Sequence, residues 1–216
     1  MSSSVLESRE SSSSEPRLNR RQAAKVRTRG KVMEAARGLF AERGYEAATI
    51  RDIARGAGMS TGAVFANFQD KAELFEAVLA EDIARIADAA SGALTSGRDT
   101  AQRLLNGLSA AYHETYDQLP LVQAIAARSW FQPASAEQRT REALKPLTDA
   151  VEGVIREGVA SGELQQDVDV KLLASLIWEA FVGNYRRAAY DQWSEAQLSE
   201  HLGLQIKAIL AGALAR

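Results

Sequence analysis

The sequence lacks cysteine and has little histidine and proline. Its 216 residues include 0 cysteines, 2 histidines and 4 prolines. Without thiols it has no disulfide framework, no thiolate metal site and no cysteine nucleophile. The two histidines, His113 and His201, lie far apart, and no acidic metal-ligand pattern surrounds either. We interpret both as ordinary helical residues and expect neither a metal nor a cofactor.

Long apolar runs are also missing, and so are the local motifs of common enzymes. A membrane span needs about 18–20 apolar residues, whereas the longest candidate, Leu172 to Val182, is interrupted by Ser175 and Glu179. The first residues have no apolar core of the signal-peptide kind. We therefore expect a cytoplasmic protein with no membrane partner. A Gly-rich phosphate loop, an HExxH motif and a supported Ser/His/Asp set are absent, which disfavours an enzyme.

The net charge of −2 conceals an uneven distribution along the chain. Residues 20–73 contain 11 Lys and Arg against 6 Asp and Glu, which gives +5. Residues 76–216 contain 13 Lys and Arg against 19 Asp and Glu, which gives −6. A basic segment on an acidic body is typical of nucleic-acid binders, although a solvated basic helix gives the same asymmetry.

The periodicity of the sequence predicts an all-α fold behind a disordered tail. Residues 1–19 hold eight serines and too little apolar surface to order themselves. Beyond them no stretch alternates with the period of a half-buried strand. The predicted helices are 21–43, a helix from Thr49, a short helix capped by Ser60, 71–90, 100–118, 119–131, 136–161, 170–190 and 195–215. Gly44 is predicted to end the first helix and 92–97 to form a loop, while Pro146 marks either a kink or a helix start.

Two short helices joined by Gly58 and Met59 have the spacing of a helix-turn-helix. Val64 and Phe68, one turn apart, would bury one face of the second helix. The opposite face would carry small, nearly chargeless side chains, which suits close approach to DNA bases in the major groove. By pattern alone, a helical hairpin in ordinary core packing remains an alternative.

One stretch resembles the DNA-binding head of TetR/AcrR-family regulators. It runs from Val32 to Leu79 as VMEAARGLFAERGYEAATIRDIARGAGMSTGAVFANFQDKAELFEAVL. The matching positions are Ala35-Ala36, Leu39-Phe40, Gly44-Tyr45, Thr49-Ile50, Asp52-Ile53-Ala54, Ala57-Gly58, Ser60, Gly62, Phe68, Lys71 and Leu74. The resemblance implies a three-helix helix-turn-helix DNA-binding domain over 20–75. It also implies a helical-bundle body over 76–216 for ligand binding and dimerisation.

The resemblance also implies DNA-contacting residues. Thr49 and Lys71 would hold phosphates, one at a helix N-terminus and the other through its charge. The groove-facing residues would be Ser60, Thr61, Gly62 and Ala63. Arg51 would reach a phosphate or a base, or else is simply a solvated arginine. Two positions depart from the family pattern: Phe65 replaces the usual tyrosine, whose hydroxyl contacts a phosphate, and Asn67 stands where histidine or tyrosine is common.

A basic run precedes and opens the first predicted helix. It consists of Arg17, Arg20, Arg21, Lys25, Arg27, Arg29 and Lys31. A flexible arm of this composition could lie in a minor groove, as homeodomain arms do. The alternative interpretation is a solubilising tail.

In the family that this chain resembles, the body dimerises through its last two helices and encloses a small effector. The predicted dimer contacts here are Leu173, Ile177, Leu202, Ile206 and Ile209, on apolar bands wider than one face needs. The predicted pocket residues are the aromatics Tyr112, Tyr116, Trp130, Phe131, Trp178 and Phe181, with Tyr185 nearby. Each aromatic taken alone could equally be plain core. Their low charge points to an apolar or aromatic effector.

The predicted function is that of a repressor which an effector releases from a palindromic DNA operator. A DNA-binding regulator or structural chromosome protein without an effector is the alternative. The helix beginning at Lys71 is expected to be the only continuous rigid link between the DNA-binding head and the pocket.

Overall fold

The computed structural model describes residues 20–129 and 131–215; the predicted disordered tail and Trp130 lie outside this part. The all-α prediction is confirmed, and the described residues form no strand beyond one isolated bridge between Leu164 and Leu214. The helices are α1 Arg20–Ala47, α2 Ile50–Gly56, α3 Thr61–Phe65, α4 Lys71–Leu94, α5 Thr100–Thr115, the 3-10 turn η1 Tyr116–Gln118, α6 Leu119–Ser129, α7 Ala134–Ala160, α8 Val170–Asp191 and α9 Glu195–Leu210. In the described part of the chain, no helix is long and apolar enough to cross a membrane.

Polar caps start several of these helices. The side chains of Thr49, Ser60 and Asp70 accept backbone N–H groups at the starts of α2, α3 and α4. Ser194 forms a full capping box with Gln197 at the start of α9. These caps confirm the predicted helix starts, because a side-chain oxygen at the N-cap satisfies an otherwise unpaired donor.

Three helix ends differ from the predictions, and the structure decides between the two alternatives at Pro146. Gly44 leaves the helical region (φ 77°), but helical structure resumes after it to Ala47. Helix α4 continues to Leu94, because the buried side chains of Ala90 and Leu94 extend its inner face past the predicted loop start. Helix α7 runs through Pro146, so it does not begin there. Helix α9 stops at Leu210, because the following backbone pairs with residues 163–165 instead.

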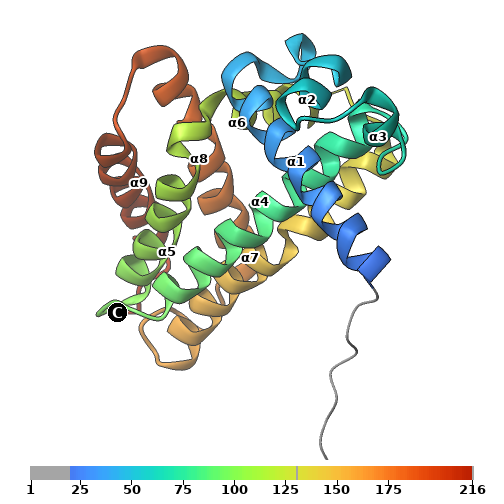
Figure 1. The fold of residues 1–216 in the computed structure, drawn as a ribbon. Coiled ribbons are helices and arrows are strands. Elements are labelled where there is room, and N and C mark those ends of the chain that lie inside the picture. Colours follow the sequence, from blue (N-terminus) through green and yellow to red (C-terminus); the bar gives the residue numbers. More distant parts are fainter. Residues whose placement is uncertain (1–19, 130, 216) are drawn as a thin grey trace, which may run out of the picture.

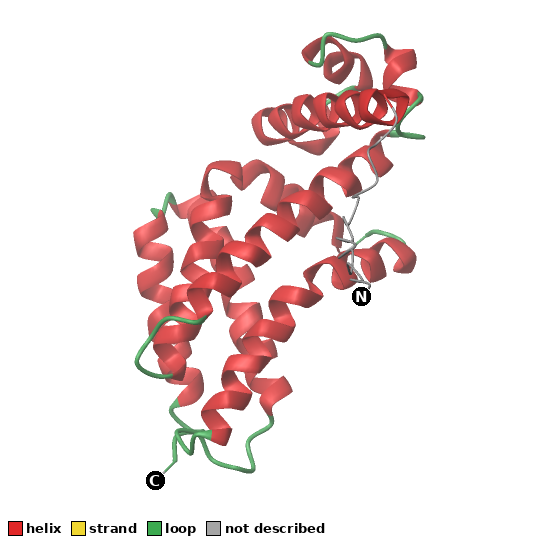
Figure 2. Ribbon diagram, turned by 60° about the horizontal axis from the view of Figure 1, so that its bottom comes forward, coloured by secondary structure: helices red, strands yellow, loops and turns green. Residues whose placement is uncertain are grey.

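The molecule is elongated, with helices α1–α3 at one end (Figures 1 and 2). Helix α4 is shared: Leu74 and Val78 lie in a core with α1–α3, whereas Ala87 and Ala90 lie in the core of the body. We call the α1–α3 end and the first turns of α4 the head, and the remainder the body. The core of the head also contains Leu121 from α6, which is 3% exposed. The expectation that α4 alone links head and body is therefore wrong, since α6 packs against α1 as well.

Candidate nucleic-acid interface

Helices α2 and α3 form a helix-turn-helix held by buried side chains and by the turn between them. Gly58 adopts φ 67°, a left-handed conformation that favours glycine. The N–H of Met59 then donates to the carbonyl of Ala54 at 2.8 Å. Ile53 of α2 and Val64 of α3 are both fully buried. The angle between the two helices is thus fixed by packing beneath them.

Helix α3 presents the surface that the sequence predicted. Val64 and Phe68 face the core, at 0% and 2% exposure. Ser60, Thr61 and Gly62 are exposed, Ala63 is half-buried, and Phe65 is 54% exposed. The Ser60 hydroxyl accepts the N–H of Ala63 at 3.2 Å. The side chains on the outer side of α3 are therefore small and uncharged, apart from the projecting aromatic ring of Phe65.

At the start of α2, Thr49 and Arg51 are both exposed, but they differ in their partners. The Thr49 hydroxyl accepts the N–H of Asp52 at 3.2 Å and donates to Asp52 Oδ2 at 2.7 Å. This hydrogen bond lowers the pKa of the Asp52 carboxyl. Arg55 pairs with the same carboxylate at 3.2 Å. Among the described residues, Arg51 makes no hydrogen bond or ion pair, so its guanidinium is available to a ligand.

Lys71 points inward, towards the end of α1 and its connection to α2. Its Nζ donates to the carbonyls of Tyr45 at 2.9 Å, Glu46 at 3.3 Å and Ala48 at 3.2 Å. It also lies 4.3 Å from the centre of the Tyr45 ring. An ammonium has three donors, and three carbonyls occupy them here. No local pattern in the sequence indicates this role, and the predicted phosphate contact would require the ammonium to exchange partners.

The C-terminal end of α3 is fastened to α1. Arg29 Nη1 donates to the carbonyl of Asn67 at 3.0 Å, and its guanidinium lies 4.1 Å from the centre of the Phe68 ring. Asn67 in turn uses its side-chain amide on the carbonyl of Ala63 at 2.9 Å. Arg29 therefore sets how α1 lies against the predicted recognition helix.

The predicted pocket aromatics divide into a packed cluster and outliers. Tyr112 is fully buried, stacks on Phe181 with ring centres 4.6 Å apart, and donates its hydroxyl to the Phe181 carbonyl at 2.8 Å. The ring centres of Trp178 and Phe181 are 5.4 Å apart. Tyr116 is half-buried and donates to the Trp193 carbonyl, whereas Phe131 is 92% exposed and lies outside the cluster.

The cluster also contains a polar pair. Tyr185 lies edge-on to Tyr112, and its hydroxyl is 2.6 Å from the hydroxyl of Thr115. Burial raises the pKa of both tyrosines, so they stay neutral. Sequence reasoning did not single out Thr115, because a threonine inside a helix carries no distinctive signal.

The apolar residues that α8 and α9 expose are not the ones predicted as dimer contacts. Ile177, Leu202 and Ile206 are at most 1% exposed within the single chain, and Leu173 and Ile209 are half-buried against the same core. The exposed apolar residues of these helices include Leu172 at 53%, Leu176 at 42% and Leu204 at 61%. The predicted dimer contacts thus stabilise the subunit itself, whereas these three leucines are uncovered in the single chain.

Known proteins resemble both the head and most of the whole chain. The family model of bacterial regulatory proteins of the tetR family matches residues 32–78. The HTH-type transcriptional repressor AcnR of Corynebacterium efficiens is 31% identical over 179 residues, which cover 83% of this chain and 90% of AcnR. The chain belongs to the TetR family.

Other TetR-family proteins match at lower coverage or lower identity. The HTH-type transcriptional repressor KstR2 of Mycobacterium tuberculosis is 31% identical over 69% of this chain and 75% of its own. The structure of the transcriptional regulator FadR from Bacillus subtilis superposes with a TM-score of 0.74, at 19% identity and over 85% of this chain and 98% of its own. The fold of head and body together is therefore that of TetR-family regulators.

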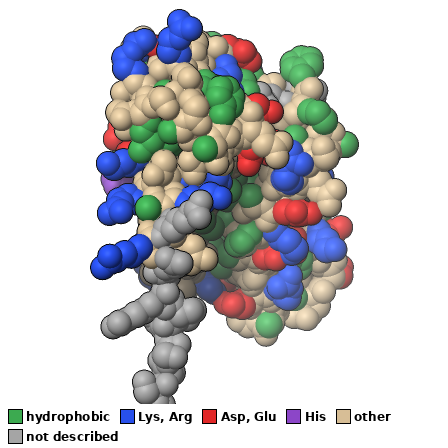
Figure 3. Space-filling model, turned by 45° about the vertical axis from the view of Figure 1, so that its right-hand side comes forward, with side chains coloured by type: hydrophobic (Ala, Val, Ile, Leu, Met, Phe, Trp, Pro, Cys, Tyr) green, Lys and Arg blue, Asp and Glu red, His purple; other side chains and the backbone are tan. Residues whose placement is uncertain are grey.

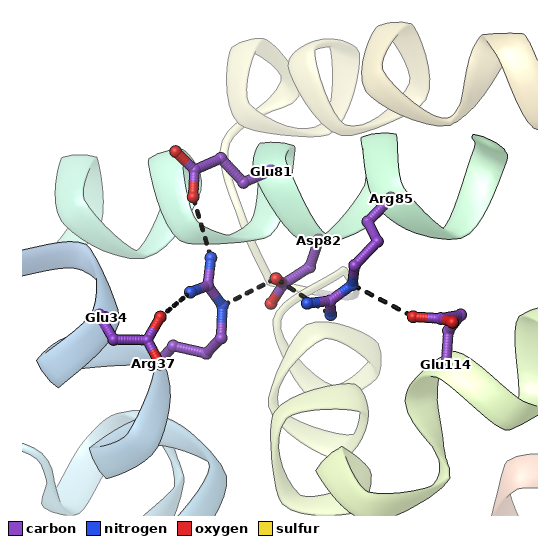
Figure 4. A network of polar contacts seen from close by, with 6 residues as sticks. All are labelled: Glu34, Arg37, Glu81, Asp82, Arg85 and Glu114. Atoms are coloured by element: carbon purple, nitrogen blue, oxygen red, sulfur yellow. Dashed lines mark hydrogen bonds and ion pairs between the residues drawn. The ribbon is translucent and has the colours of Figure 1, made fainter. Parts of the chain in front are cut away.

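An ion-pair network joins head and body in this TetR-family chain (Figure 4). Arg37 of α1 donates through Nε to Asp82 of α4 at 2.8 Å, and it also pairs with Glu34 and Glu81. Arg85 lies 3.4 Å from Asp82 and 3.3 Å from Glu114 of α5. The network therefore connects α1, α4 and α5.

Asp82 is the buried centre of that network. Its side chain is 6% exposed, and its second oxygen, Oδ2, has no partner among the described residues. Burial raises the pKa of this carboxyl, while the charges of Arg37 and Arg85 act in the opposite direction. Glu114 directly precedes Thr115, so the network ends beside the aromatic cluster of the body.

Proposed function

We propose that this protein is a homodimeric transcriptional repressor that binds a palindromic DNA operator through α2 and α3 and is released by a small effector. The observation that carries the DNA-binding part is the outer side of α3. It is capped, exposed, nearly chargeless and rigidly supported, as a helix that enters the major groove must be. Its relatives AcnR and KstR2 are named transcriptional repressors.

The exposed residues suggest separate roles in DNA binding. Thr61, Gly62 and Ala63 are small enough to let the backbone of α3 approach base edges. Phe65 would make an apolar contact such as that with a thymine methyl group, in place of the phosphate contact of a tyrosine hydroxyl. Ser60 would face the groove beside them. The phosphate contacts that we propose come from Thr49, Arg51 and Lys71.

Selection of bound duplexes from a random library tests this proposal. We expect an inverted repeat whose half-sites are separated by about one helical turn or a multiple of it, because two heads must read them together. Thr61→Val should change the selected sequence. Recovery of DNA with no shared sequence would instead favour the alternative, a structural chromosome protein.

For dimerisation, we propose that a second copy covers the outer face of α8 and α9, where Leu172, Leu176 and Leu204 lie. Leu204→Glu should yield a monomer in sedimentation at micromolar concentration, because the contact would have to bury an unpaired charge. Since Leu204 is 61% exposed, the helical circular dichroism should not change. A wild-type protein that is monomeric at this concentration would contradict the proposal.

For the effector, we propose an apolar or aromatic compound that binds near the aromatic cluster and moves α5. Two regulators with the same fold point to ligands that have a large apolar part: FadR was solved with stearoyl-CoA, whose acyl chain is apolar, and KstR2 is named a ketosteroid regulator. A movement of α5 would act on Arg37 through Glu114, Arg85 and Asp82. Operator and effector must then weaken each other's binding by the same factor, and equal effector affinity with and without operator would exclude this coupling.

A further inference from the structure

The first turns of α1 extend beyond the core of the head. The first α1 residue in that core is Val32, whereas the side chains of residues 20 and 22–27 are all exposed, with Val26 at 61%. In Figure 1 this dark blue end of α1 projects from the other helices. We call residues 20–27 the α1 overhang; at 1.5 Å per residue it is about 12 Å long.

The α1 overhang is cationic, and three of its Lys and Arg side chains are unpaired within the described part of the chain. The stretch from Arg17 to Met33 contains no Asp or Glu. Among the described residues, Arg20, Lys25 and Arg27 make no hydrogen bond or ion pair. Figure 3 shows several Lys and Arg side chains along the left edge of the view, while on its right side basic and acidic side chains are neighbours. Unpaired positive charges on a helix favour the binding of an anionic partner.

The rotation of α1 is fixed at the base of the α1 overhang. Arg29 contacts Asn67 and Phe68 directly after α3, so the side of α1 that carries Arg29 is turned towards the end of α3. Lys25 precedes Arg29 by four residues and therefore lies one turn further out on the same side. Arg27 lies about 160° around the helix from Lys25 and points the opposite way.

The helical structure changes the expected mode of DNA binding. A flexible arm could enter a minor groove, but an α-helix is about 10–12 Å wide with its side chains, and the minor groove is about 6 Å wide. Phosphate backbones border the major groove on both sides. With α3 in the major groove, the nearest anionic surface to a helix whose base contacts the end of α3 is therefore one of these backbones.

We propose that the α1 overhang is a second DNA contact, lying across the phosphate backbone beside the groove that α3 enters, with Lys25 on the DNA side and Arg27 on the solvent side. The proposal rests on DNA binding through α2 and α3. It assigns the overhang to affinity and not to sequence reading, since phosphates carry no base identity.

A matched pair of substitutions tests the contact. The logarithm of the binding constant is measured against the logarithm of salt concentration, on the selected operator and on a 30-base-pair duplex of arbitrary sequence. Lys25→Gln should make the slope shallower by about 0.9 per head, or about 1.8 per dimer, on both duplexes. Arg27→Gln removes the same charge two residues away and should leave the slope unchanged. Lys25→Arg should keep the wild-type slope.

The outcomes separate this proposal from the function it rests on. A wild-type slope in Lys25→Gln overturns the contact while leaving DNA binding intact. Equal changes in Lys25→Gln and Arg27→Gln overturn the assigned face, because they would indicate a diffuse field of the helix. Failure of the wild type to bind either duplex would instead overturn the proposed function. Both substitutions are at exposed positions, so circular dichroism should show unchanged helix content.

Discussion

Head and body use their cations differently. In the body, seven Lys and Arg side chains pair with carboxylates: Arg85, Arg103, Arg139, Arg141, Lys145, Arg156 and Arg187. Several of these pairs join helices, such as the two-bond contact of Arg139 on α7 with Glu76 on α4. In the head, Arg20, Lys25, Arg27 and Arg51 have no such partner among the described residues. Arg98, Lys171 and Lys207 of the body are also unpaired in the described structure, but they lie far along the chain from the helix-turn-helix.

This difference shows which charges serve the fold and which remain for a ligand. The field of a paired cation is largely cancelled by its carboxylate partner, whereas an unpaired cation adds to the positive potential that attracts phosphates. The net charge of the segment does not make that distinction, since Arg37 and Lys71 are as positive as Arg51 but are held by the protein. Three substitutions test the comparison.

The largest effect is expected where a cation of the head is held by the buried carboxylate of Asp82. Arg37→Met should lower the free energy of unfolding by about 3 kcal/mol, because it leaves a buried charge with poorer compensation. Urea unfolding measures the change. The matched body variant, Arg141→Met, breaks an exposed pair within α7 and should cost less than about 0.5 kcal/mol. Stability of Arg37→Met within about 1 kcal/mol of wild type would contradict the importance of the network.

Lys71→Met should have an intermediate effect on stability. Losing the ammonium leaves three carbonyls at the end of α1 and in its connection to α2 without their donor, a loss of about 1–2 kcal/mol. If the ammonium also exchanges to a phosphate in the complex, as we propose, the salt slope of DNA binding becomes shallower by about 0.9 per head. Lys145→Met, on an exposed pair of α7, is the control for both measurements. An unchanged slope would remove Lys71 from the DNA-contacting set and leave it a purely structural role.

Arg51→Gln should have the smallest effect on stability and a clear effect on DNA binding. Its side chain holds no partner in the described protein, so the free energy of unfolding should stay within about 0.5 kcal/mol of wild type. DNA affinity should fall, as measured by fluorescence anisotropy. Arg156→Gln removes a body cation that is paired with Glu152 and should leave affinity unchanged. If the two variants bind DNA equally well, the distinction between free and paired cations fails.

Local features could be predicted from the sequence, and long-range pairings could not. Caps such as Ser60 and Ser194 lie within three residues of the groups they satisfy, so their pattern is visible along the chain. The pairing of Arg37 with Asp82 spans 45 residues and leaves no local trace. The apolar residues of α9 predicted a broad apolar band on this helix. Which face lies inside depends on neighbouring helices, so Ile206 proved buried and Leu204 exposed.

The position of Leu121 has a consequence for the exchange of parts between proteins of this fold. This α6 residue completes the core of the head, together with partly buried Ala143 and Leu144 of α7. A head transplanted onto another body would meet a different side chain at that place and would lose either packing or fit. Chimeras should therefore keep their affinity for DNA only when α6 and the first half of α7 are transferred together with the head. The segment that must be exchanged as one piece is thus longer than the segment that contacts DNA.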